Sequence, residues 1–249
     1  MPRLFSRRAF LALTGAVASG AALAACAPAT PGQPPVFAPA TPTLRSPAKL
    51  GGDAALDRLV QGNIRYVAGH MIYPDQTAER RAQVAQSQSP FAAVLCCTDS
   101  RVAPEVVFDQ GLGDLFVVRV AGPVLDDTLL GSLEYGVTQL GLALVVVLGH
   151  TQCDTVRAAL EATYLGAQVP PHGGSLVTAL QPALAAALAN SGDLWHDAIT
   201  ANIRLVAAAL QTSEPLLANA VKTGGLKIVG AIYDLDTGWV ELVPPEAKK

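Results

Sequence analysis

Two short segments of the sequence carry the residues with the clearest capacity for chemistry. Cys97, Asp99 and Arg101 stand close together, and His150 and Cys153 follow later in the chain. Two cysteine thiolates and one imidazole fill three positions of a tetrahedral Zn²⁺ site and leave the fourth for water, which distinguishes catalytic from structural zinc. The sequence therefore predicts a catalytic zinc site with Cys97, His150 and Cys153 as ligands.

Both segments follow apolar runs that are typical of buried strands. Residues 91–96 lead into Cys97, and residues 143–148 lead through Gly149 into His150. Continuous rather than alternating apolar residues indicate strands covered on both faces, as in a parallel sheet. Because the carboxyl ends of such strands form the usual binding crevice of open α/β sheets, we expect the two segments to converge on one metal ion.

The sequence after residue 50 alternates further helices and strands, which predicts an α/β fold. One apolar stripe predicts an amphipathic helix over 53–69. A turn at 236–238 predicts that strands 226–233 and 238–243 pair as a hairpin. The remaining expected elements are a strand over 115–120, helices over 128–140 and 154–164, and helices within 175–224.

The two metal-binding motifs resemble those of the β-class carbonic anhydrases. That family carries Cys-x-Asp-Ser-Arg and His-x-x-Cys, which residues 97–101 and 150–153 match. The resemblance extends over roughly residues 52–243. It implies a mostly parallel sheet flanked by helices, with an antiparallel hairpin at its C-terminal edge, and a dimer or larger homo-oligomer with its pocket at the subunit interface.

The resemblance also implies three substrate-binding residues. Gln88 lies in a Gln-Ser-Pro segment that matches the lead-in of the family, and Phe116 and Tyr135 stand where the family has a Phe and a Tyr lining the substrate pocket. By this resemblance, Gln88 and Tyr135 are expected to serve the site of the partner subunit.

The activity implied is the reversible hydration of carbon dioxide to bicarbonate and a proton by zinc-bound hydroxide. Zn²⁺ lowers the pKa of bound water from about 15.7 toward ~7. Two thiolate ligands neutralise much of the metal charge, so we expect activity to rise on the alkaline side. Asp99 would accept a hydrogen bond from the hydroxide, and Arg101 would hold Asp99 through a charge-assisted pair. In some members of the family the equivalent Asp binds zinc as a fourth ligand and closes the site, and those members carry a Trp at the position of Val94. Because this chain has Val94 there, we expect an open site with water on zinc.

Two positions depart from the family pattern. Asp154 stands where glycine is usual, and either caps the following helix or reshapes the pocket. Pro123 replaces a common asparagine and removes a backbone donor.

Two alternatives therefore stay open: hydrolysis of a CO₂ analogue such as carbonyl sulfide or carbon disulfide, and a non-catalytic zinc-binding or thiol-redox role at the cell surface. The Asp99–Arg101 pair argues against zinc storage, because storage needs no oriented hydroxide.

The sequence divides into an export leader, a linker and one catalytic domain. Residues 1–26 resemble a twin-arginine signal that ends in Leu-Ala-Ala-Cys, a lipobox-like sequence in which Cys26 would be acylated. The alternative is an ordinary signal peptide, with Cys26 unmodified or removed. Residues 27–50 are rich in Pro, Ala and Thr and predict a semi-rigid tether. Residues 51–249 form the expected β-carbonic anhydrase-like domain.

This organisation predicts an exported protein. We expect it in the periplasm or on the outer cell surface, anchored to the membrane through an acylated Cys26. The net charge of −3 and the absence of a basic cluster argue against nucleic acid as a partner. The expected partners are CO₂ and bicarbonate, further copies of the same chain and the lipid anchor.

Overall fold

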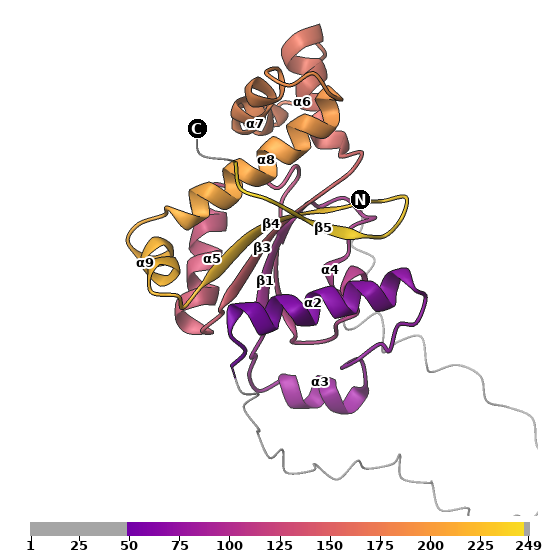
Figure 1. Ribbon diagram of the computed structural model, residues 1–249, viewed down its shortest axis with the longest axis vertical. Coiled ribbons are helices and arrows are strands. Elements are labelled where there is room, and N and C mark those ends of the chain that lie inside the picture. The colour runs from indigo at the N-terminus through magenta and orange to yellow at the C-terminus, as the bar shows by residue number, and fades with distance from the viewer. Residues whose placement is uncertain (1–48, 247–249) are drawn as a thin grey trace, which may run out of the picture. The chain divides into compact units, whose positions relative to one another are not determined.

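A five-stranded sheet lies at the centre of residues 49–246, the part of the chain that the computed structural model describes (Figure 1). The strand order is β2-β1-β3-β4-β5, and only the last pair is antiparallel. The strands are β1 Ala92–Cys96, β2 Leu115–Arg119, β3 Leu144–His150, β4 Lys227–Tyr233 and β5 Val240–Val243. This arrangement confirms the predicted sheet. The predicted signal, Cys26 and nearly all of the linker lie outside the described residues.

The two strands that precede the metal-binding motifs occupy the interior of the sheet. All residues of β1 and β3 are buried, as their continuous apolar sequences predict. The strands pair in parallel, with Cys96 opposite Leu148. Their carboxyl ends therefore lie side by side and bring the two motifs together.

The predicted hairpin between β4 and β5 is confirmed. Asp234 shapes its turn, because its carboxylate accepts hydrogen bonds from the backbone N–H groups of Asp236 and Thr237. Gly238 has φ +81°, a left-handed conformation that glycine adopts without strain. Its N–H donates to the Asp234 carbonyl at 2.9 Å and closes the turn.

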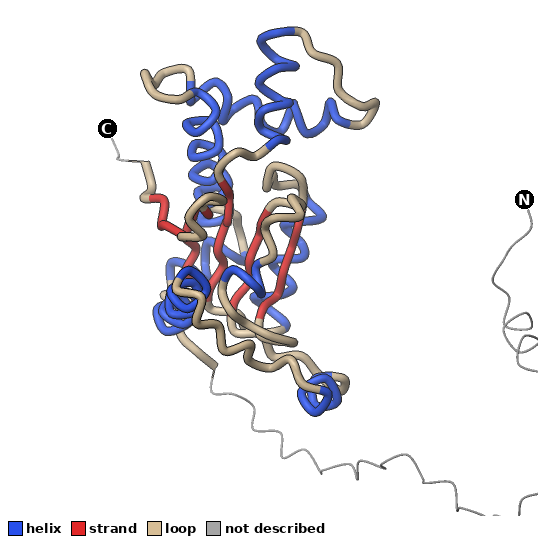
Figure 2. Tube along the Cα trace, turned by 90° about the vertical axis from the view of Figure 1, so that its right-hand side faces the viewer, coloured by secondary structure: helices blue, strands red, loops and turns tan. Residues whose placement is uncertain are grey.

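Helices cover both faces of the sheet, as Figure 1 and the side view in Figure 2 show. Helices α2 and α4 pack with one core, and α5 to α9 pack with the other. The helices are α2 Gly52–Val67, α3 Ala78–Val84, α4 Pro104–Val107, α5 Asp127–Gln139, α6 Asp154–Leu165, α7 Gly173–Ala187, α8 Leu194–Gln211 and α9 Leu216–Lys222. The longer ones agree with the predicted helices, whereas α3 and α4 were not predicted. Within residues 49–246, no helix combines the length and apolar character needed to cross a membrane.

The neighbouring cysteines of β1 contribute to different cores. Cys96 lies in the core beneath α2, and Cys97 lies in the core beneath α8. This confirms the expected alternation of side chains along a strand. Burial raises the pKa of Cys96 to about 12, so that this thiol stays protonated and behaves as a small apolar residue.

Candidate metal centre

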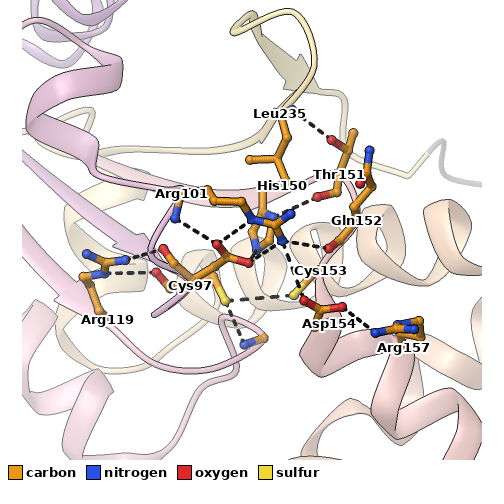
Figure 3. Close-up of polar contacts among 12 residues, drawn as sticks. Cys97, Arg101, Arg119, His150, Thr151, Gln152, Cys153, Asp154, Arg157 and Leu235 are labelled. Carbon is orange, nitrogen blue, oxygen red and sulfur yellow. Dashed lines mark hydrogen bonds and ion pairs between the residues drawn. The ribbon is translucent and has the colours of Figure 1, made fainter.

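Cys97, His150 and Cys153 form a buried cluster at the carboxyl ends of β1 and β3 (Figure 3). One potential ligand atom from each residue lies within 4.8 Å of the others, and the two Sγ atoms are 3.9 Å apart. The parallel pairing of β1 and β3 creates this proximity, although the cysteines are 56 positions apart in the chain. The predicted convergence is confirmed.

His150 presents one ring nitrogen to this cluster. Its Nδ1 lies 2.9 Å from the carbonyl of Thr151 and donates to it, which leaves the lone pair on Nε2. Nε2 is buried and has no hydrogen-bond partner among the described residues. A buried polar atom without a partner costs about 1–3 kcal/mol. A cation bound between this nitrogen and two sulfurs would satisfy it, and the donor set is one that Zn²⁺ prefers.

The two cysteines have unequal proton affinities. The Cys153 thiol donates to the Cys97 sulfur, which lowers the pKa of Cys97 in spite of burial. The same contact, together with burial, raises the pKa of Cys153. The N–H of Gly122 also donates to the Cys97 sulfur at 3.4 Å. The cluster therefore stabilises a thiolate next to the free nitrogen of His150, which favours a cation at this position.

Backbone contacts fix the loop that carries His150 and Cys153. Gln152 lies between them with φ +54°, the left-handed conformation that turns the chain from the strand into α6. The hydroxyl of Thr151 accepts a hydrogen bond from the Leu235 N–H at 3.0 Å. The indole N–H of Trp195 donates to the Cys153 carbonyl at 3.0 Å. Contacts from the turn after β4 and from α8 thus position the second half of the cluster.

Asp99 lies beside the cluster and is held by Arg101. The Arg101 backbone N–H and Nε donate to Asp99 Oδ1 at 2.9 and 3.0 Å, and a second guanidinium nitrogen donates to Oδ2 at 2.7 Å. These bonds lower the pKa of Asp99 to about 2. Its Oδ2 is 3.9 Å from His150 Nε2. An ionised carboxylate in a fixed orientation therefore borders the cluster.

Arg119 is a site residue that the sequence analysis did not identify. It is the last residue of β2, and its guanidinium donates to the carbonyls of Cys97 at 3.0 Å and Asp99 at 2.8 Å (Figure 3). It thereby fixes the loop that joins the first ligand to the carboxylate. A charged residue at the carboxyl end of a strand next to β1 is a signal from which this role could have been inferred.

The structure explains how the two departures from the family pattern are accommodated. Asp154 is the first residue of α6, where a carboxylate favours the helix dipole, and its Oδ1 accepts from Arg157 at 2.8 Å. Pro123 lies in a loop that Asn202 holds, because the carbonyls of Gly122 and Pro123 accept hydrogen bonds from the side chain of Asn202.

The three predicted substrate-binding residues do not lie beside the metal cluster of their own chain. Phe116 pairs with Ala93 in β1, four positions before Cys97, which corresponds to about 13 Å along a strand. Tyr135 lies beside Phe116, with ring centroids 6.4 Å apart, and is half exposed. Gln88 precedes β1 and is exposed. These roles stay predictions, and they require a second chain.

The sequence and the fold are similar to those of known proteins. The sequence model of a family described as carbonic anhydrase matches residues 92–240. The carbonic anhydrase of Mycolicibacterium smegmatis is 41% identical over 189 residues, which cover 76% of this chain and 92% of that protein. The structure of the β-carbonic anhydrase CcaA covers 76% of this chain and 99% of its own, with 25% identity and a TM-score of 0.59. One of two tetrameric β-carbonic anhydrases of Sordaria macrospora covers 66% and 85%, with 20% identity and a TM-score of 0.59.

Proposed function

Because this chain belongs to the β-carbonic anhydrase family, we infer that it catalyses the zinc-dependent, reversible hydration of CO₂ to bicarbonate and a proton. The observation that carries this function is the buried Nε2 of His150, which has no hydrogen-bond partner within residues 49–246 and lies beside the sulfurs of Cys97 and Cys153. The ionised Asp99 at its border adds the carboxylate that zinc storage would not need.

Each residue around the cluster has a separate role in this reaction. When bound, Zn²⁺ lowers the pKa of a coordinated water and supplies hydroxide near neutral pH. Asp99 is an acceptor at every physiological pH, because its pKa is about 2. It could therefore accept a hydrogen bond from the nucleophile that bound zinc would supply and orient it toward CO₂. Arg101 keeps the carboxylate in that orientation.

Arg119 and Trp195 act on the backbone rather than on the reacting atoms. Arg119 holds the carbonyls of Cys97 and Asp99, and Trp195 holds the carbonyl of Cys153. Together these contacts hold the backbone of both halves of the site. A loop shift of about 1 Å can cost 10²-fold in rate, so these contacts support catalysis without touching the substrate.

The substrate distinguishes this activity from the chemistry of related gases. Purified zinc-loaded protein should consume CO₂ rapidly in stopped-flow measurements and show much slower loss of carbonyl sulfide and carbon disulfide in headspace analysis. Faster consumption of a sulfur analogue than of CO₂ would contradict the proposed function. The Asp99→Asn variant should retain zinc and lose most of the CO₂ hydration.

The complete site is proposed to form between copies of this chain. Phe116 and Tyr135 lie far from the cluster of their own chain, whereas β2, which carries Phe116, is an edge strand of the sheet. An edge strand with half-buried apolar side chains is suited to pairing with a second copy. In a two-fold arrangement, a second chain would supply Gln88, Phe116 and Tyr135 to the cluster. The tetrameric structures from Sordaria macrospora are consistent with a homo-oligomer.

Subunit complementation tests this shared site. Cys97→Ser removes a metal ligand, and Tyr135→Ala removes a pocket residue, so that each variant alone should have little activity. In a two-fold dimer, co-expression of the two should restore about a quarter of the wild-type activity, since half of the dimers are mixed and each contains one intact site. No restoration by mixed dimers, verified with two affinity tags, would contradict a site built from two chains.

The protein is further proposed to act outside the cytoplasm. The twin-arginine motif supports export, and the lipobox-like sequence at Cys26 supports acylation. The Pro/Ala/Thr-rich segment supports a tether between the lipid anchor and the domain. Fractionation of cells that express the whole chain should place it with membranes, and mass spectrometry should find a diacylated or triacylated N-terminal Cys26. A Cys26→Ala variant in the same membrane fraction would contradict a lipid anchor.

A further inference from the structure

Arg101 contacts a second carboxylate besides that of Asp99. A guanidinium nitrogen of Arg101 lies 3.8 Å from Oδ2 of Asp154, and the same nitrogen donates to the Gln152 carbonyl at 3.3 Å (Figure 3). The other oxygen of Asp154 accepts from Arg157. Arg101 therefore bridges the loop that carries Cys97 and the loop that carries Cys153.

These contacts form a row of alternating charges along the rim of the site. Asp99, Arg101, Asp154 and Arg157 follow one another, each within 4.0 Å of the next. The row carries two positive and two negative charges and is therefore neutral. With the glycine that is usual in the family, the same row would carry a net positive charge beside the metal site.

We propose that Asp154 is a positioning residue that sets the anion affinity of the metal site through Arg101. Its carboxylate lies 3.8 Å from the guanidinium nitrogen that also donates to Asp99, and it compensates a positive charge that would otherwise attract anions. Bicarbonate, the product of hydration, and inhibitory anions such as thiocyanate are the ligands concerned. The inference rests on the proposed function for bicarbonate, but its effect on thiocyanate depends only on a bound metal.

The exposure of these groups limits the size of the effect. The side chains of Arg101 and Asp154 are 46% and 65% exposed, so water and salt screen their charges. One such charge near a binding site is expected to change anion affinity by about two- to tenfold. The direction of the change in anion affinity follows from the charge that is removed: loss of the Asp154 carboxylate strengthens anion binding, and loss of the Arg157 guanidinium weakens it.

Thiocyanate binding to the metal-loaded protein tests the proposal. Asp154→Asn should lower the dissociation constant about two- to tenfold. Asp154→Glu, which keeps the carboxylate, should have the wild-type constant, and Arg157→Gln should have a higher one. Asp53→Asn is the matched control. Asp53 also lies in the first turn of a helix and pairs with a cation, Lys227, but it lies at the amino ends of the strands. This variant should leave the constant unchanged.

Two readouts separate this proposal from the proposed function. Inhibition of CO₂ hydration gives the dissociation constant of thiocyanate for the zinc enzyme. Visible absorption of the cobalt-substituted protein gives the same constant without an activity measurement. The KM for bicarbonate should fall in Asp154→Asn in parallel with the thiocyanate constant. A purely structural role at the start of α6 would lower stability without shifting anion affinity in opposite directions for the two variants. Equal thiocyanate constants for the wild type and Asp154→Asn in the cobalt protein would overturn the proposal.

Discussion

Replacement of Arg101 by glutamine is the most informative single change at this site. Arg101→Gln keeps the backbone N–H that donates to Asp99 but removes both side-chain hydrogen bonds to that carboxylate, at 3.0 and 2.7 Å, together with the weaker one to the Gln152 carbonyl at 3.3 Å. It leaves the three metal ligands in place. The variant therefore separates the orientation of the carboxylate from metal binding.

The size of the effect follows from these contacts. Arg101 is 46% exposed, so solvent weakens both bonds to Asp99. Misplacement of a catalytic group by about 1 Å can cost 10²-fold in rate, and the remaining backbone N–H limits the shift of the carboxylate. We therefore expect a decrease of roughly 10- to 100-fold in kcat/KM.

The dependence on pH identifies the cause of this loss. The Arg101 side chain lowers the pKa of Asp99 to about 2, and its removal would let that pKa rise toward the ordinary value, because burial acts in that direction while the backbone N–H of residue 101 still opposes it. Asp99 would still be ionised at pH 7. The deficit in kcat/KM should consequently be the same from pH 7 to 9 and reflect orientation alone.

Stopped-flow CO₂ hydration at several pH values, with the zinc content measured on each sample, is the assay. Arg157→Gln serves as the control, since Arg157 lies on the same rim but contacts Asp154 rather than Asp99. It should change kcat/KM by less than about threefold. Full activity of Arg101→Gln, or a deficit that disappears at alkaline pH, would show that Arg101 does not act by orienting Asp99.

Three further changes test the surroundings of the site. Arg119→Gln should release zinc to a chelator about three- to tenfold faster, because two carbonyl contacts to the ligand loop are lost; an unchanged release rate would contradict this role. Gly122→Ala should lower the free energy of unfolding in urea by about 1–3 kcal/mol, since Gly122 has φ +67° and a Cβ would lie 3.1 Å from Thr155; equal stability would show that the loop relaxes freely. Burial acts to raise the pKa of Asp109, but Arg65 and two backbone N–H groups outweigh it and hold the pKa below its usual value. The pair should therefore stabilise the fold at neutral pH and lose this contribution as the pH falls below about 4. Asp109→Asn should cost about 2–4 kcal/mol at pH 7 in urea unfolding and reduce the loss of stability toward acid pH, whereas an identical pH dependence would contradict the pairing.

Local sequence patterns were sufficient to predict most of the fold. The apolar runs before Cys97 and His150 predicted two interior parallel strands, and both are fully buried. Helices α3 and α4 were missed because they have only 7 and 4 residues, too few to show an apolar period. Each depends instead on a local signal at its start: the Thr77 side chain accepts from the Arg80 N–H, and Pro104 occupies the first turn of α4.

The candidate site was predictable only where its residues share a motif. Cys97, Asp99 and Arg101 are close in sequence, so their chemistry could be interpreted before their positions were known. The contacts of Arg119, Gly122 and Trp195 join residues 20 to 42 positions apart, and they arise from strand order and helix packing. The pairing of Arg101 with Asp154 likewise depends on the register of β1 and β3.

We propose that zinc held by Cys97, His150 and Cys153 makes this protein a carbonic anhydrase. To test this, the metal-free protein is titrated with zinc, and CO₂ hydration is measured by stopped flow at each step. The rate should rise in proportion to bound zinc and level off at about one zinc per chain, and Cys97→Ser should show no such rise. Full zinc occupancy of the three ligands without CO₂ hydration would contradict a carbonic anhydrase activity at this site.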